Sequence, residues 1–158
     1  MAIRQIFTDD APFLSKVAKP VEKFDDKLRQ LLDDMADTMY NAQGVGLAAP
    51  QVGILRRIAV IDVGDGIVEL INPKILSCSG TVGAIEGCLS YPGQSGYVER
   101  PQRIIVQAFD RHGVMKVYDA HNLFARAVAH ETDHLDGKVF LSLVTEPPEG
   151  FQQYEAEE

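Results

Sequence analysis

The chain has 158 residues, 46% of them hydrophobic, and a formal net charge of −8 at pH 7. This is enough for one folded domain with a single core, whereas the negative charge argues against nucleic acid as a direct ligand. No apolar run approaches the roughly 20 residues of a membrane span, the N-terminus does not read as a signal peptide, and two cysteines without a clear pairing suit a reducing cytoplasm.

The first predicted element is an amphipathic helix at about residues 25–41. Asp25 or Asp26 can cap its start. Its hydrophobic residues recur at i, i+3, i+4, i+7 and i+11, which places them on one helix face. They are Leu28, Leu31, Leu32, Met35 and Met39.

The next segment, residues 44–51, has the sequence G-V-G-L-A-A-P-Q. It matches neither of the glycine-rich patterns that bind phosphates. Its small residues allow the backbone to approach a ligand or another strand, and the side-chain amide of Gln51 could donate a hydrogen bond to a developing oxyanion. Taken alone, the segment is most simply interpreted as a tightly packed turn.

Strands are predicted by β-branched and alternating residues at about 57–63, 68–72, 74–81, 103–109 and 114–118. Pro73 is expected to end the second of these strands. A helix, several strands and a second helix indicate an α+β fold. We expect one domain over residues 1–158, with mostly antiparallel sheets packed around the second helix. From about residue 146 we expect an acidic tail that is a candidate for disorder.

The second helix carries the most informative stretch, H-E-T-D-H at residues 130–134. Positions i and i+4 share one face of a helix, so His130 and His134 can bind the same metal ion. Glu131 lies beside the first histidine, where a carboxylate can handle the proton of a metal-bound water. The alternative is a helix with ordinary histidines. However, Leu123 and Ala127 continue the same face, which points the imidazoles inward, where a metal would offset their desolvation.

A third metal ligand is needed, because catalytic zinc-type sites usually have three protein ligands and an open position. The pattern H-E-x-x-H-x-x-G-x-x-H fails, since Phe140 occupies its last position. The chain beyond His134 is too short to build a further helix that carries a glutamate ligand comfortably. We therefore look upstream and favour Cys88, which follows Gly87 in E-G-C-L-S, over Cys78. By itself Cys88 is equally compatible with a buried free thiol.

Together, G-V-G-L-A-A-P-Q, E-G-C-L-S and H-E-T-D-H-L-D-G occur in the order of the three motifs of the peptide deformylase family, which they resemble. The resemblance covers about residues 3–143. It implies a metallohydrolase that removes the N-formyl group from the N-formylmethionine of newly made polypeptides and releases formate.

The resemblance also implies the metal chemistry. Cys88, His130 and His134 would be the metal ligands. Glu131 would be the general base and acid while a metal-bound water attacks the formyl carbonyl. One divalent ion per chain is implied, with Fe2+ first and Zn2+, Ni2+ or Co2+ as replacements.

The remaining implied roles concern the substrate, an N-formylmethionyl nascent peptide. Gln51 and the backbone N–H of Leu89 would stabilise the oxyanion. The backbone at Gly46 would pair with the substrate as an added strand. Apolar residues beside the motifs are candidates for a pocket that accepts the methionine side chain: Val45, Tyr91 and Ala127.

Three features depart from the family pattern. Ala129 stands where the family usually has glutamine, and residues 94–96 are Gln-Ser-Gly where an arginine commonly follows the second motif. The long basic C-terminal helix with which some members dock on the ribosome is missing, so transient ribosome association stays open. A small peptidase and a catalytically dead metal-binding module are the rival functions. The presence of Glu131 and Gln51, which are not needed to hold a metal, favours an active deformylase.

Overall fold

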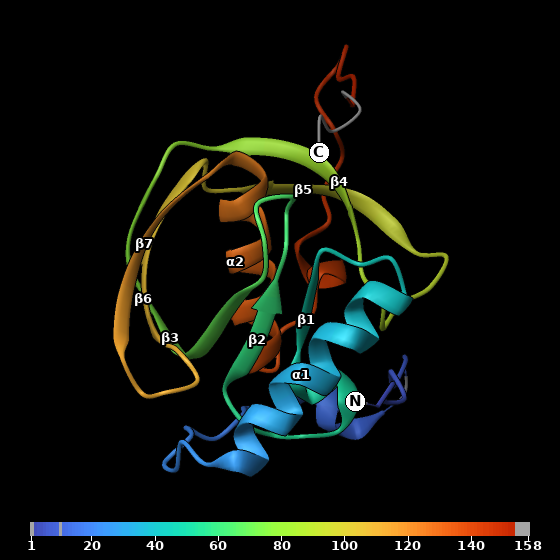
Figure 1. The fold of residues 1–158 in the computed structure, drawn as a ribbon. Coiled ribbons are helices and arrows are strands. Elements are labelled where there is room, and N and C mark those ends of the chain that lie inside the picture. Colours follow the sequence, from blue (N-terminus) through green and yellow to red (C-terminus); the bar gives the residue numbers. More distant parts are fainter. Residues whose placement is uncertain (1, 10, 154–158) are drawn as a thin grey trace.

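The computed structural model describes residues 2–9 and 11–153 (Figure 1). The expected acidic tail is therefore described from residue 146 to residue 153, and its end lies outside the described residues. Three short 3-10 helices lie within the described chain, at Pro12–Ser15, Ala49–Val52 and Phe140–Leu143. No helix of the described part is long and apolar enough to cross a membrane.

The described residues form an α+β fold, as expected, and every strand pair is antiparallel. One sheet has five strands in the order β1-β2-β3-β6-β7, and the second sheet contains only β4 and β5. The strands are β1 (Gly46–Ala48), β2 (Ile58–Ile61), β3 (Val68–Ser79), β4 (Val82–Gly87), β5 (Ser95–Arg100), β6 (Arg103–Phe109) and β7 (Met115–His121). The helices are α1 (Asp26–Asn41) and α2 (Asn122–Leu135).

Helix α1 follows the predicted apolar spacing. The carboxylate of Asp25 accepts a hydrogen bond from the backbone N–H of Leu28 at 3.0 Å and so caps the helix start. The side chains of Leu32, Met35 and Met39 are completely buried, where they pack in one hydrophobic cluster with residues of β1 and β2. The apolar face of α1 therefore holds β1 in place, and β1 forms one side of the site described below.

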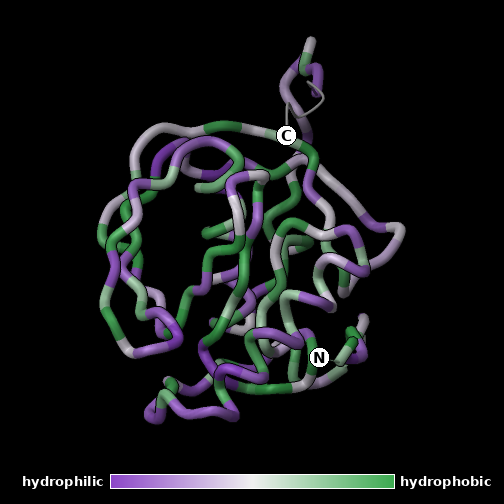
Figure 2. Tube along the Cα trace, in the orientation of Figure 1, coloured by the Kyte–Doolittle hydropathy of each residue, from purple (hydrophilic) through white to green (hydrophobic). Residues whose placement is uncertain are grey.

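Helix α2 lies within the curve of the five-stranded sheet (Figure 1). Its sheet-facing residues are small, and Ala125, Val128 and Ala129 pack in a buried cluster with Ile61, Leu70 and other sheet residues. Small side chains let a helix backbone lie close to a sheet. Figure 2 shows the matching hydropathy, with hydrophobic stretches along the central strands. Helix α2 is therefore the central element to which the sheets are fitted.

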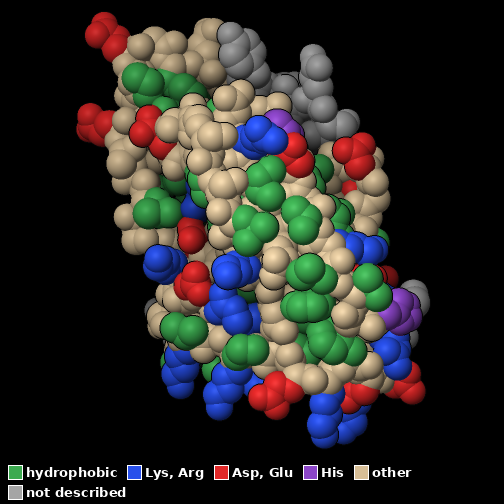
Figure 3. Space-filling view, turned by 90° about the vertical axis from the view of Figure 1, so that its left-hand side faces the viewer, with side chains coloured by type: hydrophobic (Ala, Val, Ile, Leu, Met, Phe, Trp, Pro, Cys, Tyr) green, Lys and Arg blue, Asp and Glu red, His purple; other side chains and the backbone are tan. Residues whose placement is uncertain are grey.

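The outer surface of β3, β6 and β7 has a mixed character. Figure 3 shows hydrophobic side chains on this side of the molecule standing between charged ones. The exposed residues of β7 include Met115 and Val117 together with Lys116 and Asp119. A lysine within an edge strand is a common protection against pairing with another chain.

The strand prediction was wrong at Pro73. The two runs at 68–72 and 74–81 form one strand, β3, because the pairing with β6 shifts register between Ile71 and Lys74. Proline has no N–H to donate, and a bulge is where a strand accommodates it. The short strands β1, β4 and β5 were not predicted; they contain several glycines and little alternation of polar and apolar residues.

We predict that Leu32→Ala lowers the free energy of unfolding by about 2–5 kcal/mol, because it opens a cavity beneath α1. Denaturant unfolding followed by circular dichroism measures this change. Leu76→Ala is the control: Leu76 is 47% exposed on β3, so its loss should cost less than about 1 kcal/mol. Equal costs for the two variants would contradict the packing described for α1.

Candidate metal centre

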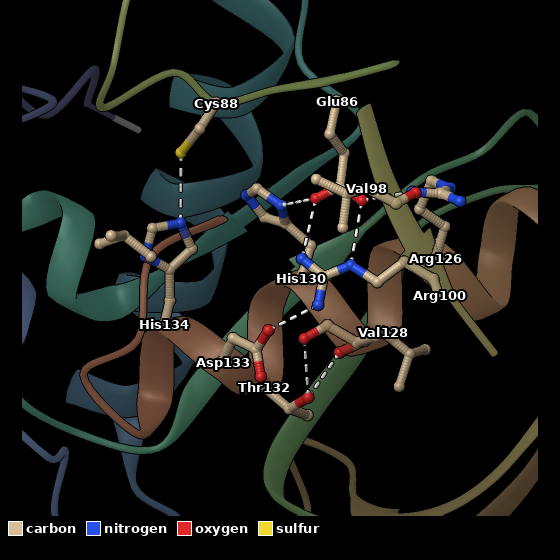
Figure 4. Close-up of polar contacts among 12 residues, drawn as sticks. Glu86, Cys88, Val98, Arg100, Arg126, Val128, His130, Thr132, Asp133 and His134 are labelled. Atoms are coloured by element: carbon tan, nitrogen blue, oxygen red, sulfur yellow. Dashed lines mark hydrogen bonds and ion pairs between the residues drawn. The ribbon is translucent and has the colours of Figure 1, made fainter. Parts of the chain in front are cut away.

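Three potential metal ligands meet between α2 and the end of β4. One side-chain atom from each of Cys88, His130 and His134 lies within 4.8 Å of the others. The sulfur of Cys88 is 3.2 Å from Nε2 of His134, and Figure 4 shows this contact. The two histidines are one turn apart on α2 and their ring centroids are 5.0 Å apart. The structure thus brings the three predicted ligands together.

Cys88 lies at the start of the turn that follows β4, and this turn sets its orientation. The backbone N–H of Tyr91 donates to the carbonyl of Cys88 at 3.0 Å, which closes the turn and aims the thiol at α2. Both histidines are almost completely buried, with 8% of His130 and 1% of His134 exposed. Sulfur and two imidazole nitrogens suit zinc and other late first-row metals.

A buried carboxylate orients the first histidine. The Oε1 atom of Glu86 is 2.8 Å from Nδ1 of His130, so a neutral imidazole that donates from Nδ1 presents its Nε2 lone pair to Cys88 and His134. Arg100 donates to both carboxylate oxygens of Glu86, at 2.8 and 3.0 Å. These hydrogen bonds and the arginine charge hold the pKa of Glu86 far below its usual value, although burial acts in the opposite direction.

The network continues from Arg100 of β5 back to α2 (Figure 4). Arg100 also donates to Asp133 on α2 at 2.6 Å, and Arg126 donates to Glu86 at 2.5 Å. The buried carboxylate of Glu86 and the partly buried carboxylate of Asp133 are thus balanced by two guanidinium groups. Because Glu86 is fully partnered, it is a fixed acceptor for His130.

The charge environment of the three ligands favours a cation. Burial lowers the pKa of His134 to about 3, which leaves its imidazole neutral, with the lone pair of one ring nitrogen available. Burial also disfavours the charged form of His130, but the nearby Cys88 sulfur and the hydrogen bond with Glu86 raise its pKa to about 10. The groups around His130 therefore favour a positive charge over a proton-free, uncharged site. A divalent ion would supply that charge and displace the proton.

Glu131 is buried directly beside this cluster. Burial raises the pKa of its carboxyl group to about 7, and its Oε1 atom has no hydrogen-bond partner within the described chain. Its Oε2 atom faces Gly46 of β1 so closely that a Cβ atom at that position would lie 2.4 Å away. The orphaned oxygen and the three ligand atoms fit a site built around a metal ion and its water. The donor set therefore fits the group that the sequence predicted.

Gln51 and Leu89, the two predicted oxyanion donors, lie beside the same space. The side chain of Gln51 is fixed because its Oε1 accepts from the backbone N–H of Ala48 at 2.9 Å. Its Nε2 then donates to Ser90 at 3.1 Å and to the sulfur of Cys88 at 3.5 Å. The backbone N–H of Leu89 donates to no group within the described chain.

A cavity of about 440 Å³ adjoins the cluster. Its walls come from the segment before and within β1, from β4 and the turn after it, and from α2. All of the predicted catalytic and substrate-binding residues line it, namely Val45, Gly46, Gln51, Leu89, Tyr91, Ala127 and Glu131. Cys88 and His130 line it as well, so the cavity opens onto the candidate metal centre.

Two of the three departures from the family pattern, Ala129 and residues 94–96, lie at different places in the structure. Ala129 is buried in the core cluster on the sheet side of α2 and does not line the cavity. Gln94 lines the cavity, and its amide donates to Asp9 at 3.0 Å. An uncharged amide beside a carboxylate therefore occupies the region where an arginine was expected.

Sequence analysis missed the charged residues behind the ligands. Glu86 begins the E-G-C-L-S motif, and Arg126 is one turn before His130, but no spacing rule connects them to Arg100. A carboxylate two residues before a predicted ligand was the available signal, since ligating histidines usually donate their second N–H to such a group.

A model of the family described as polypeptide deformylase matches residues 3–148. A peptide deformylase of Caldicellulosiruptor bescii is 55% identical over 144 residues, which cover 91% of this chain and 87% of that protein. Peptide deformylase 1 of Bacillus subtilis is 49% identical over 147 residues, which cover 92% of each chain.

Solved structures show the same similarity. A peptide deformylase from Thermotoga maritima superposes with a TM-score of 0.91 at 41% identity, covering 92% of this chain and all of that one. A peptide deformylase from Ehrlichia chaffeensis, solved in complex with actinonin, has a TM-score of 0.89 at 42% identity and covers 92% of this chain and 91% of that one.

We predict that Gly46→Ala abolishes most turnover, by about a hundredfold or more, and leaves metal binding intact. The added Cβ would collide with Oε2 of Glu131 and displace the carboxylate that the sequence predicts to carry the proton. Steady-state turnover, metal content and melting temperature are measured on one preparation. Full activity at an unchanged melting temperature would show that β1 does not fix the position of Glu131.

We also predict that Glu86→Gln weakens metal binding by about ten- to a hundredfold, because His130 loses its anionic partner. Competition with a chelator measures the affinity, and Glu86→Asp serves if the glutamine variant does not fold. Asp119→Asn, at an exposed ion pair with Arg103, is the control for loss of one carboxylate. Equal affinities for Glu86→Gln and the unaltered chain would exclude the orienting role.

Proposed function

The chain belongs to the peptide deformylase family, and from this membership we infer which of its residues remove the N-formyl group from newly made polypeptides. It is a metalloenzyme and a hydrolase, and its substrates are formylated nascent peptides. The observation that carries the residue assignment is that ligand atoms of Cys88, His130 and His134 lie within 4.8 Å of one another, beside the cavity that Cys88 and His130 line.

We assign the metal to these three side chains. The bound ion supplies Lewis acidity, which polarises a carbonyl and lowers the pKa of a bound water to about 7. Of the candidate metals we propose Fe2+ as the native ion, with Zn2+, Ni2+ or Co2+ as replacements. A thiolate with two imidazoles accepts all of these ions.

Glu131 is the proposed general base and acid. Its buried carboxyl has a pKa of about 7, which suits a group that takes a proton from water and returns it to the leaving amine near neutral pH. Because Oε1 has no other partner in the described chain, it is available to that water.

The proposed oxyanion donors are Nε2 of Gln51 and the backbone N–H of Leu89. The hydrogen bond from Ala48 to Gln51 fixes which end of the amide faces the cavity, so Nε2 can exchange its long contact with the Cys88 sulfur for an oxyanion without a turn of the amide, and such fixed donors are effective. Removal of one such donor typically costs about a hundredfold or more in turnover.

Substrate binding is proposed along β1. This strand pairs with β2 on one side only and is therefore an edge of the five-stranded sheet. An extended peptide can add to such an edge through main-chain hydrogen bonds at Gly46. The methionine side chain would then enter the apolar part of the cavity, beside Val45, Tyr91 and Ala127.

The remaining proposals concern context. We propose that the whole chain, residues 1–158, acts as one catalytic domain in the cytoplasm, and that any contact with the ribosome is transient. An active deformylase is favoured over a small peptidase or a dead binding module, because Gln51 and Glu131 both face the cavity that adjoins the metal ligands.

The test is release of formate from formyl-Met-Ala-Ser by protein loaded anaerobically with Fe2+. We expect turnover by the unaltered chain, a loss of about a hundredfold or more in Gln51→Ala, and a larger loss in Glu131→Gln. Both variants should retain one metal per chain, since neither residue is an assigned ligand.

The rival functions give other results. Cleavage of an unformylated peptide at an internal bond would indicate a peptidase. A metal-loaded, folded protein that releases no formate would indicate a binding module. Turnover that survives in Glu131→Gln would remove Glu131 from the mechanism.

A further inference from the structure

The wall of the cavity opposite β1 is a small and weakly supported sheet. Strands β4 and β5 form a sheet of their own, which gains one bridge between Tyr97 and Thr145, and a two-stranded hairpin depends on such outside contacts because alone it is marginally stable in water. Ile85, Glu86 and Gly87 of β4 nevertheless line the cavity. The position of this hairpin relative to α2 therefore sets the width of the cavity.

One side chain of α2 contacts both strands of the hairpin. Arg126 donates from Nη1 to the carbonyl of Val98 on β5 at 3.1 Å and to the carboxylate of Glu86 on β4 at 2.5 Å. From Nη2 it donates to the carbonyl of Val82, at the other end of β4, at 2.6 Å. Only 11% of its side chain is exposed. The guanidinium thus connects the helix to three points of the hairpin.

The same residue lies on the cavity side of α2. Leu123, Arg126 and Ala127 all line the cavity together with His130, and their spacing places them on one face of the helix. The charge of Arg126 is paired with the carboxylate of Glu86, and its two terminal nitrogens are occupied by the acceptors described above. Its effect on a ligand is therefore exerted through the position of β4.

We propose that Arg126 is a positioning residue that fixes the separation of α2 from the β4–β5 hairpin and so makes the cavity selective for an unbranched side chain of methionine size. This inference rests on the proposed function, because it assigns the methionine side chain to this cavity. A hairpin released from α2 would move outward and admit larger side chains.

The test compares formate release from formyl-Met-Ala-Ser and formyl-Phe-Ala-Ser in Arg126→Met. Methionine has a similar reach and keeps the wall apolar, so the variant removes the hydrogen bonds without opening a large cavity. Glu86 keeps Arg100 and His130 as partners, and metal content should stay at one ion per chain. We expect the kcat/KM ratio of the two substrates to fall about tenfold or more, mainly through KM, with faster hydrogen exchange in β4 and β5.

Two further variants complete the test. Arg126→Lys keeps the charge but cannot reach all three acceptors, and it should show a partial loss of selectivity. Arg103→Met removes a surface arginine paired with Asp119 on β7 and should leave the ratio unchanged.

The outcomes separate the two claims. If Arg126→Met retains the substrate ratio of the unaltered chain, or loses kcat equally for both substrates, the inference is overturned and the proposed function stands. If the unaltered chain releases no formate from either substrate, the proposed function fails and the inference fails with it.

Discussion

A single buried carboxylate, that of Glu86, connects the parts on which the site depends. It accepts hydrogen bonds from His130 on α2, from Arg100 on β5 and from Arg126 on α2, and it is itself part of β4. A buried charge is costly unless it is fully partnered. Here the partners come from α2, which carries both histidines, and from β5 of the hairpin whose first strand, β4, leads into Cys88. Removal of the carboxylate would leave two guanidinium groups without their main acceptor.

The position of the Glu86 carboxylate links the arrangement of the predicted metal ligands to the position of β4, which lines the cavity. Glu86 lies two residues before Cys88, so the strand that orients His130 also delivers the thiol. On the opposite side, β1 is held by α1 and meets Glu131 at Gly46, where only hydrogen leaves room for the carboxylate. The reacting groups are therefore fixed between two strands and one helix, which is the kind of rigid support that catalysis requires.

The features that could be predicted from the sequence are those that depend on local residue patterns. The histidines were predictable because the period of a helix places i and i+4 on one face, and Cys88 was favoured once the later residues had been excluded. The prediction that a strand ends at Pro73 was wrong, because β3 continues through a bulge whose position depends on the pairing with β6. The role of Arg126 was not predictable, since its acceptors at Val82, Glu86 and Val98 lie 28 to 44 residues away.

The central claim is that one sulfur and two nitrogens of this chain bind a single metal. X-ray absorption spectroscopy of the zinc-loaded protein measures this directly. The account predicts one sulfur neighbour at about 2.3 Å and two imidazole nitrogens at about 2.0 Å, with the sulfur lost in Cys88→Ser and kept in Cys78→Ser. A spectrum without sulfur, or one whose sulfur disappears with Cys78, would contradict the account.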